Sequence, residues 1–452
     1  MALWTNVPCP GCGCVCDDVS LTFDGRKLVD FQPRCPLGER WFGVHGQAST
    51  STAELDGKPA SYAEAIEHAA GLLQRSDYPL IYGLSRSATP GQRAAVALAE
   101  QLGGAIDTTA SLCHGPSIMA QQEVGEVTCT LGEIRNRADL VVFWGCHPAS
   151  SHPRHAERYS VFPRGRHVRS GRSGRTVVMV GDAQQVTNWR LDSTGAKPDF
   201  VVPIEAGRDF EALSALRVML RGGTVPTASR EVMRLFDCMR RCRYGIVFFG
   251  LGITETSMWD GQLHPPIGHI NVAALLRLVT ELNEVTRFTA RRMRIHGGVS
   301  GAENVLCWQT GYPFAVDMSR GYPRYNPGEY SANELLARQS TDLCLLVGAE
   351  TVPYFSAAAQ EHLRSIPTIV LDYPGVPLDF SPTVRFTTSV YGLHSSGMVY
   401  RMDNVPVTLK GLLNSEAPTD EQVLTDLSNR LGLPDDHATG PADSNAQGGS
   451  IR

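Results

Sequence analysis

The run Leu140-Val-Val-Phe-Trp-Gly145 is apolar at every position until it ends in glycine. A strand this short and this apolar is typical of a parallel sheet that helices cover on both faces. Five further runs have the same form, at residues 80–83, 177–181, 246–250, 343–348 and 368–371. Helical patterns lie between them, at 62–74 behind Ser61, at 92–102 before Gly103 and at 272–282 behind Asn271. This alternation predicts the α/β class with mostly parallel sheets.

The composition is that of a folded protein with a large core. The chain has 452 residues, of which 42% are hydrophobic and 19% charged, and at roughly 150 residues per domain this length predicts about three domains. A formal net charge of −5 gives no positive field for a nucleic acid, so we expect no such partner. The first ten residues lack the pattern of a signal peptide, and no apolar run approaches bilayer length, so we expect a cytoplasmic protein without a membrane span.

The pattern changes along the chain and predicts four parts. Residues 1–57 hold five of the twelve cysteines and two alternating runs around the turn Asp24-Gly25, which predicts a small β domain built round a metal. We expect one α/β domain from 58–137 plus 325–433, and a second from 138–324. Residues 434–452 are rich in Asp, Gly, Ser and Ala, and we expect a disordered tail there.

The N-terminal cysteines have the spacing of a metal site. Cys9, Cys12 and Cys16 form C-x2-C-x3-C, and Cys35 follows 18 residues later. Three thiolates on one loop and a fourth from a neighbouring hairpin suit a [4Fe–4S] cluster. Zinc is the alternative, although a zinc knuckle normally meets a second C-x-x-C or His pair, and unligated thiols are a third. Cys14 lies inside the loop as a spare.

Five longer strings resemble the B subunit of formylmethanofuran dehydrogenase and its bacterial relatives in the formyltransferase/hydrolase complex. The likeness runs from Cys9 to about residue 410. The strings are Cys9-Pro-Gly-Cys-Gly-Cys-Val-Cys-Asp-Asp18, Asp107-Thr-Thr-Ala-Ser-Leu-Cys-His-Gly-Pro-Ser117, Asn136-Arg-Ala-Asp-Leu-Val-Val-Phe-Trp-Gly-Cys146, Thr310-Gly-Tyr-Pro-Phe-Ala-Val-Asp317 and Arg324-Tyr-Asn-Pro-Gly-Glu329.

The resemblance implies a molybdopterin-oxidoreductase-like fold, with an iron–sulfur domain followed by two α/β domains. In that family a tungsten or molybdenum ion, held by two pterin guanine dinucleotides, reduces CO2 to formate or runs the reverse. The matching positions here are Cys113 as the thiolate on the metal, with His114 and Arg294 beside it as catalytic residues. An imidazole can shuttle a proton and a guanidinium can hold a formate-like anion. Taken alone, Cys113 is a buried core thiol, His114 a turn residue and Arg294 part of a solvated basic patch.

Three turns depart from the family pattern at pterin contacts. The family has an Asp-Pro-Arg-Lys-Thr type turn where this chain has Gly181-Asp-Ala-Gln-Gln-Val-Thr187. An acidic residue before Gly397 is replaced by His394 or Ser395, and an Asp-Pro turn by Gly348-Ala-Glu-Thr-Val-Pro353. We therefore expect a degenerate pterin site.

Residues 152–175 form the most basic stretch, with seven Arg, three His and only Glu157 as an acid. A pyrophosphate or a polyglutamyl tail would suit such a run. A solvated loop or a subunit contact is the commoner interpretation, and we prefer it.

We expect the chain to be the B subunit of a formyltransferase/hydrolase complex in one-carbon metabolism, a redox-silent scaffold or channel for the one-carbon product. The partners implied by the family are an amidohydrolase-like A subunit, a C subunit of glycine-rich repeats and a formyltransferase D subunit, acting on a formylated methanofuran-type cofactor. The alternative is a redox-active dehydrogenase subunit with a tungsto- or molybdopterin. A third hypothesis is an independent zinc- or nucleotide-binding protein, because Gly250-Leu-Gly252 is a fragment of a dinucleotide motif.

Overall fold

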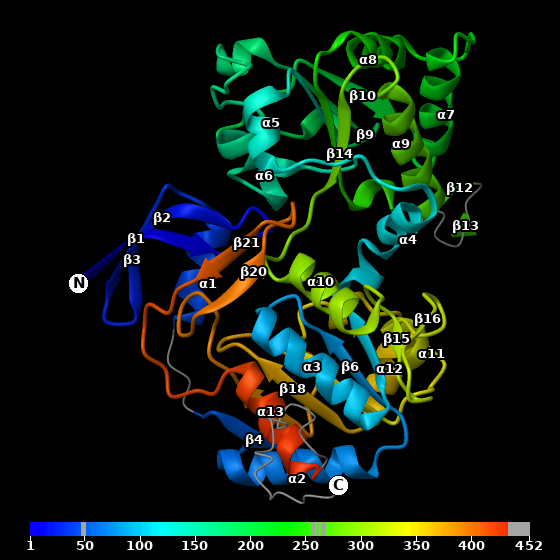
Figure 1. Cartoon of the computed structure of the whole chain (residues 1–452). Helices are drawn as coiled ribbons and strands as arrows, with labels where there is room; N and C mark the ends of the chain where they lie inside the picture. The colour runs from blue at the N-terminus through cyan, green and yellow to red at the C-terminus, as the bar shows by residue number, and fades with distance from the viewer. Residues whose placement is uncertain (47–50, 255–257, 260–261, 264–267, 433–452) are drawn as a thin grey trace, which may run out of the picture.

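The computed structural model describes residues 1–46, 51–254, 258–259, 262–263 and 268–432. Figure 1 shows a small N-terminal β unit beside two larger units, each built on its own sheet with helices around it. The predicted α/β class with parallel sheets is confirmed, and the small N-terminal β unit agrees with it. The predicted tail at 434–452 lies outside the described residues.

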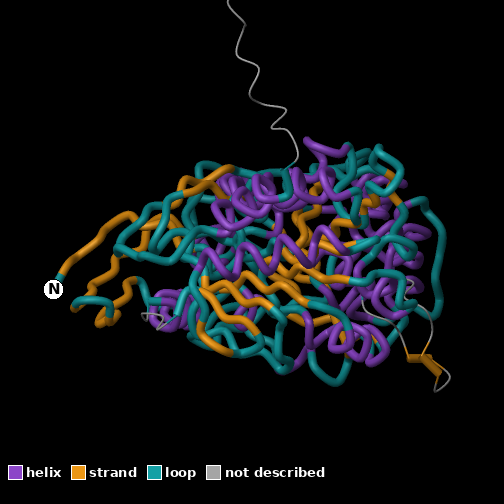
Figure 2. The backbone as a smooth tube through the Cα atoms, turned by 90° about the horizontal axis from the view of Figure 1, so that it is seen from below, coloured by secondary structure: helices purple, strands orange, loops and turns teal. Residues whose placement is uncertain are grey.

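The N-terminal unit is a three-stranded antiparallel sheet followed by a helix. Its elements are β1 (Ala2–Cys9), β2 (Cys16–Asp24), β3 (Lys27–Gln32) and α1 (Pro36–His45). The predicted turn joins β2 to β3, and Gly25 adopts φ +58° there, which glycine reaches without strain. Val19, Leu21 and Phe23 alternate along β2 and are buried on one face. Figure 2 shows the end of this sheet projecting from the main body.

The larger unit holds a nine-stranded sheet whose five central strands are parallel and whose edge strands are antiparallel. In spatial order the strands are β16 (Arg324–Tyr325), β15 (Val316–Asp317), β7 (Ala105–Thr108), β6 (Pro79–Gly83), β17 (Leu343–Val347), β18 (Thr368–Asp372), β19 (Val384–Thr387), β4 (Ala53–Leu55) and β5 (Lys58–Pro59).

Helices cover both faces of this sheet, as the apolar strands require. Ile81 belongs to one hydrophobic cluster and its neighbour Leu80 to the other, because successive strand side chains point to opposite faces. One face packs against α2 (Tyr62–Arg75), α3 (Thr89–Leu102), α10 (Val299–Thr310) and α13 (Asp420–Arg430), and the other against α11 (Ala332–Ala337) and α12 (Ala357–Ser365). Ser61 forms a capping box with Glu64, and Gly103 ends α3 in the left-handed region, as predicted.

The second unit holds a five-stranded, fully parallel sheet. Its strands, in spatial order, are β10 (Phe200–Ile204), β9 (Thr176–Asp182), β8 (Leu140–Trp144), β11 (Gly245–Phe249) and β14 (Phe288–Arg292). One face packs against α4 (Gly115–Val124), α7 (Asp209–Leu220), α8 (Arg230–Arg241) and α9 (Gly268–Leu282). The other face shares a hydrophobic cluster with α5 (Leu131–Arg137) and with the N-terminal unit. The cysteine-bearing unit therefore packs directly on this sheet.

Shorter elements complete the described chain. They are α6 (Pro148–Ser151), the π-helical turn Ala156–Ser160, and two hairpins, β12 (Met258–Trp259) with β13 (Gln262–Leu263) and β20 (Gly397–Tyr400) with β21 (Pro406–Leu409). In Figure 1 the β20–β21 hairpin lies beside the N-terminal sheet.

Two expectations differ from the structure. Asn271 does not cap a helix, because α9 already begins at Gly268 and the buried Asn271 amide donates to the Ile253 carbonyl at 3.3 Å. The predicted range 138–324 includes α10 and β15, which belong to the nine-stranded unit because β15 pairs with β7. Likewise β4, placed in 1–57, pairs with β19. Within the described ranges no helix has both the length and the apolarity to cross a bilayer, and the cytoplasmic location stays a prediction.

Candidate functional site

The four predicted metal-binding cysteines lie around one cavity. Cys9 ends β1 and faces Cys16 at the start of β2, Cys12 lies in the loop between them, and Cys35 precedes α1. All four are buried, and they line a small cavity together with Arg154. The three cysteines of the C-x2-C-x3-C loop and the distant Cys35 thus place their side chains around the same cavity.

The thiols influence one another's ionisation. Burial, and then the neighbouring Cys16 and Cys12, raise the pKa of Cys9 well above its usual value. Burial raises the pKa of Cys35 to about 11. A hydrogen bond from Cys14 instead lowers the pKa of Cys16, helped by nearby arginines. Thiols crowded in this way favour a positively charged centre that stabilises them as thiolates.

Among the described residues, no group of three or more His, Cys, Asp or Glu side chains is arranged around a single metal-ion position. The four cysteines instead surround a space. A [4Fe–4S] cluster takes each of its thiolates on a different iron atom, so it needs sulfurs around a cavity rather than around a point. The four buried thiols that line this cavity are therefore donors of the kind a cluster takes.

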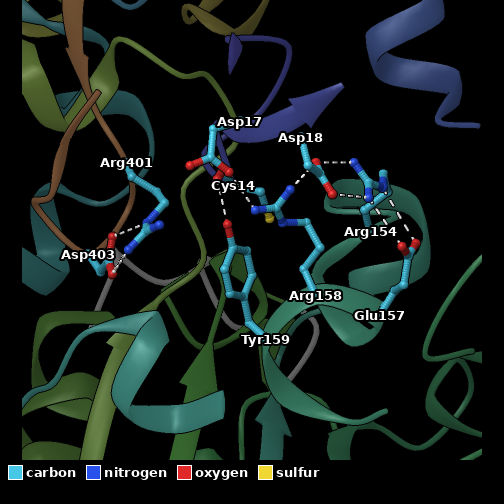
Figure 3. A network of polar contacts seen from close by, with 9 residues as sticks. All are labelled: Cys14, Asp17, Asp18, Arg154, Glu157, Arg158, Tyr159, Arg401 and Asp403. Carbon is cyan, nitrogen blue, oxygen red and sulfur yellow. Dashed lines mark hydrogen bonds and ion pairs between the residues drawn. The ribbon is translucent and has the colours of Figure 1, made fainter. Parts of the chain in front are cut away.

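One residue of the basic stretch 152–175, Arg154, lines this cavity, and two further arginines of the stretch are held by protein groups. Arg154 is 3% exposed, and its guanidinium donates two hydrogen bonds of 2.8 Å to Asp18, directly after the cysteine loop. Arg158 pairs with Asp17 at 2.6 Å, and buried Arg175 donates to the Pro163 carbonyl at 2.5 Å. The preferred interpretation of a solvated loop is therefore wrong for these three residues, because carboxylates and carbonyls hold them inside the protein. Figure 3 shows the network around Asp17 and Asp18.

Cys113, His114 and Arg294 come together between the two larger units. Cys113 and His114 lie between the carboxyl end of β7 and α4, and Arg294 follows β14. Burial raises the pKa of the Cys113 thiol, and the positive charge of Arg294 opposes that rise. The sequence resemblance thus named residues that do meet in space, although their roles stay predictions.

The imidazole of His114 is fully engaged within the protein. Its Nε2 donates to the Met293 carbonyl at 3.2 Å, so its Nδ1 accepts from the Ser117 hydroxyl at 3.0 Å. Burial and the charge of Arg294 hold its pKa well below the usual value. A neutral ring with both nitrogens bonded fixes the Cys113 loop against β14.

The Arg294 guanidinium forms one ion pair and keeps one nitrogen, Nη1, without a hydrogen-bond partner among the described residues. The guanidinium is 3% exposed and forms an ion pair with Glu303 of α10. Its Nη1 atom is buried and has no hydrogen-bond partner among the described residues. A buried guanidinium normally satisfies its donors, so this atom is a hydrogen-bond donor available to an anionic ligand. No sequence signal pointed to Glu303.

The main chain joins the cysteine loop to the Arg294 segment. The Arg294 carbonyl accepts from the Gly13 amide at 3.1 Å and from His152 Nε2 at 2.6 Å. The Gly297 amide donates to the Pro10 carbonyl at 3.2 Å. A Cβ atom on Gly13 would lie 2.0 Å from the Arg294 oxygen, so only glycine allows this approach.

A larger cavity adjoins the cysteines. It measures about 220 Å³ and shares Gly11 and Leu37 with the wall of the cysteine cavity. Its other walls bring together basic and aromatic side chains, among them Arg40, Trp41, His45, Arg86 and His296. Arg86 lies at the carboxyl end of the nine-stranded sheet, where open α/β sheets bind ligands. An anionic ligand with a flat ring fits such a lining.

In the three turns that differ from the family pattern, side chains of this chain make the local contacts. At the end of β9, a Cβ atom on Gly181 would lie 2.5 Å from the Trp189 ring, which also stacks on His147 at 6.0 Å between centroids. Beyond β17, Glu350 pairs with Arg86 at 3.6 Å and is almost buried. His394 accepts from the Val390 amide within its own turn. These three turns do not present the phosphate-binding groups that the family pattern has there.

No family model matches the chain, but individual relatives do. It is 37% identical over 422 residues to the B subunit of the tungsten-containing formylmethanofuran dehydrogenase 2 of Methanocaldococcus jannaschii, covering 90% of this chain and 93% of the relative. It is 35% identical over 430 residues to the protein of the same name from Methanococcus maripaludis, covering 92% and 95%. The B subunit of the formyltransferase/hydrolase complex Fhc of Methylorubrum extorquens is 26% identical over 308 residues, covering 67% and 75%.

One solved structure shares the fold. The crystal structure of the formyltransferase/hydrolase complex FhcABCD from Methylorubrum extorquens with methylofuran contains a chain that superposes with a TM-score of 0.68. The match covers 84% of this chain and 98% of that chain, at 24% sequence identity.

Proposed function

Because the chain belongs to the family of formylmethanofuran dehydrogenase B subunits, we propose that it is the B subunit of a complex acting on a formyl group carried by a furan-type cofactor. We further propose that it contributes a redox centre. The reaction interconverts CO2 and formate, with two electrons and one proton on the CO2 side. The formyl group then passes between formate and the carrier with release or uptake of one water.

The relatives support the partners. The FhcABCD structure is a four-subunit complex with methylofuran bound, and the Methylorubrum relative is its B subunit. We infer corresponding neighbours for this chain: an amidohydrolase-like A subunit, a C subunit and a formyltransferase D subunit. When isolated from them, the chain is expected to have low activity.

The observation that carries the redox proposal is a pair of neighbouring cavities that share the wall residues Gly11 and Leu37. Four buried cysteines line the first cavity, and the Arg294 segment is bonded to the cysteine loop. Cys9, Cys12, Cys16 and Cys35 would hold a [4Fe–4S] cluster. Arg40 and Trp41 would hold an anionic pterin, because Arg86 is already paired with Glu350 and Asp372. Cys113 would be the thiolate ligand of its tungsten or molybdenum. When bound, that metal supplies the two-electron chemistry.

The chain's own residues position the one-carbon unit. The unpaired Nη1 of Arg294 binds a carboxylate oxygen, and the ion pair with Glu303 holds the guanidinium in place. We assign His114 a positioning role, because both ring nitrogens are already bonded. Soft thiolate ligation by Cys113 suits the metal.

The test is metal analysis and formate-dependent dye reduction on the complete complex, purified without oxygen. We expect about four Fe per copy of this chain, with tungsten or molybdenum. Cys113→Ser should lose the tungsten or molybdenum and the dye reduction while keeping the iron. Arg294→Gln should keep all metals and lose dye reduction. Exposed Cys307→Ser is the matched control. Full dye reduction in the Cys113→Ser complex would refute the proposal.

A redox-silent subunit is the second candidate, and the filled turns at Trp189 and Glu350 favour it. In that case the other subunits transfer and hydrolyse the formyl group, and this chain is a scaffold or a channel. The complex would then hydrolyse the formyl carrier at the same rate with or without tungsten and molybdenum. A strict requirement for either metal would contradict this candidate.

A further inference from the structure

Arg154 places a buried positive charge in the wall of the cysteine cavity. Its side chain is 3% exposed and lines the cavity together with the four cysteines. It reaches this position from the segment between α6 and the π-helical turn, far from the cysteine loop in sequence. A positive charge at this position therefore acts on any group that the four cysteines bind.

The guanidinium is fixed in orientation. It forms a two-pronged pair with Asp18 at 2.8 Å and 2.8 Å, and it also contacts Glu157 at 3.1 Å (Figure 3). Asp18 and Glu157 are 44% and 53% exposed, so water screens their negative charges. Arg154 itself has no such screening. The charge that acts on the cavity is therefore mainly the positive one.

Arg154 and Cys16 line the same cavity, and the carboxylate that holds Arg154 belongs to Asp18, two residues after Cys16. Stabilising a thiolate and stabilising the reduced form of a cluster are the same electrostatic effect, because reduction adds one negative charge to an already anionic group.

We propose that Arg154 tunes the redox centre: its buried guanidinium stabilises the reduced state of a [4Fe–4S] cluster in the cysteine cavity, and Asp18 counterbalances it. This inference rests on the proposed function. Arg154 does not coordinate iron; it acts on the cluster through its positive charge. The step concerned is the uptake of one electron by the cluster, supplied by dithionite in the test.

The test is a dithionite titration of the intact complex, followed by electron paramagnetic resonance. Arg154→Gln should shift the oxidised-to-reduced equilibrium about tenfold toward the oxidised state, ~59 mV more negative for a one-electron couple. Asp18→Asn should shift it in the opposite direction. Arg154→Lys keeps the charge and should retain most of the wild-type potential.

Arg172→Gln is the matched control from the same basic stretch. Arg172 pairs with Asp199 at 2.9 Å and does not line the cavity, so its loss should leave the potential unchanged. Iron content is measured in every variant.

The outcomes separate the two proposals. A wild-type complex without iron would overturn the proposed redox function and this inference with it. Four iron atoms and an unchanged potential in Arg154→Gln would overturn the inference alone. Should Arg154→Gln lose its iron, Asp18→Asn still decides, because a positive shift supports the tuning and an unchanged potential refutes it.

Discussion

Asp107 is a buried carboxylate that organises the loop carrying Cys113, and replacing it with asparagine should destabilise the protein. It is 0% exposed and accepts hydrogen bonds from three backbone amides: Thr108 at 2.9 Å, Ala315 at 2.9 Å and Ala332 at 2.7 Å. These amides belong to the end of β7, the residue before β15 and the first turn of α11. One carboxylate, six residues before Cys113, thus ties three segments together.

The magnitude follows from the number of acceptors. The side chain introduced by Asp107→Asn would offer one oxygen, so its NH2 group would face at least one amide donor. Burial raises the pKa of Asp107 to about 7, so above that pH the side chain is charged. Loss of a hydrogen bond to a charged group costs about 1.5–3 kcal/mol, and the buried donor left unpaired costs a comparable amount. We expect a loss of about 3 kcal/mol. For an unfolding unit of 150–250 residues this corresponds to a fall of roughly 6–12 °C in Tm.

The assay is thermal unfolding of the full chain by circular dichroism. Asp342→Asn is the matched control, because Asp342 also accepts three hydrogen bonds, from the Ser76 hydroxyl and the Asp77 and Tyr78 amides, but is exposed. Water can satisfy those donors, so the control should lose about 1 kcal/mol or less. If the two variants lost equal Tm, the reasoning from buried donors would be wrong.

Three further predictions concern the cysteine unit and the buried pair at β17. Cys12→Ser should lower the iron bound per complex by at least half, whereas exposed Cys307→Ser should not change it; equal iron in both would contradict the ligand set. Gly13→Ala should weaken iron retention during gel filtration, because its Cβ atom would lie 2.0 Å from the Arg294 oxygen, while Gly43→Ala, whose Cβ would meet Leu28 at 4.0 Å, should behave as wild type. Burial raises the pKa of Glu350 from its usual 4.5 to about 7, although Arg86 opposes the rise. The folded state therefore holds this proton more tightly than the unfolded state, so its contribution to stability is present below about pH 4.5 and is lost as the pH rises through 7. Glu350→Gln should flatten the fall in Tm between pH 5 and pH 7.5; an unchanged slope would show that other groups cause it.

Six strands of the two sheets could be predicted from the sequence, because their apolar runs carry the signal of burial on both faces. These strands are β6, β8, β9, β11, β17 and β18. β14 was not predicted because Phe288-Thr-Ala-Arg-Arg292 ends in two arginines, yet it pairs fully with β11. β4 and β15 have only two or three residues, and so short a segment has no periodicity to detect. These two strands form only because they pair with strands that are distant in the sequence, β15 with β7 and β4 with β19.

The candidate site was predictable to the extent that spacing or family strings marked it. The cysteine spacing indicated one site, and the family strings indicated that Cys113 and Arg294 belong together. Composition could not show that Arg154 is buried, because its carboxylate partner Asp18 lies 136 positions away. A run of arginines is usually solvated, and only the tertiary fold brings this one against the cysteines.

The joint between the cysteine loop and the Arg294 segment consists of main-chain groups on both sides. The Arg294 carbonyl that receives Gly13 is present whatever side chain residue 294 carries, so mutation of the guanidinium leaves the joint intact. Catalytic groups can therefore be lost by substitution without dismantling the architecture that once positioned them. A lineage can abandon the electron chemistry and keep the subunit as a building block of the assembly, which is a route by which dehydrogenases and hydrolytic complexes come to share one fold.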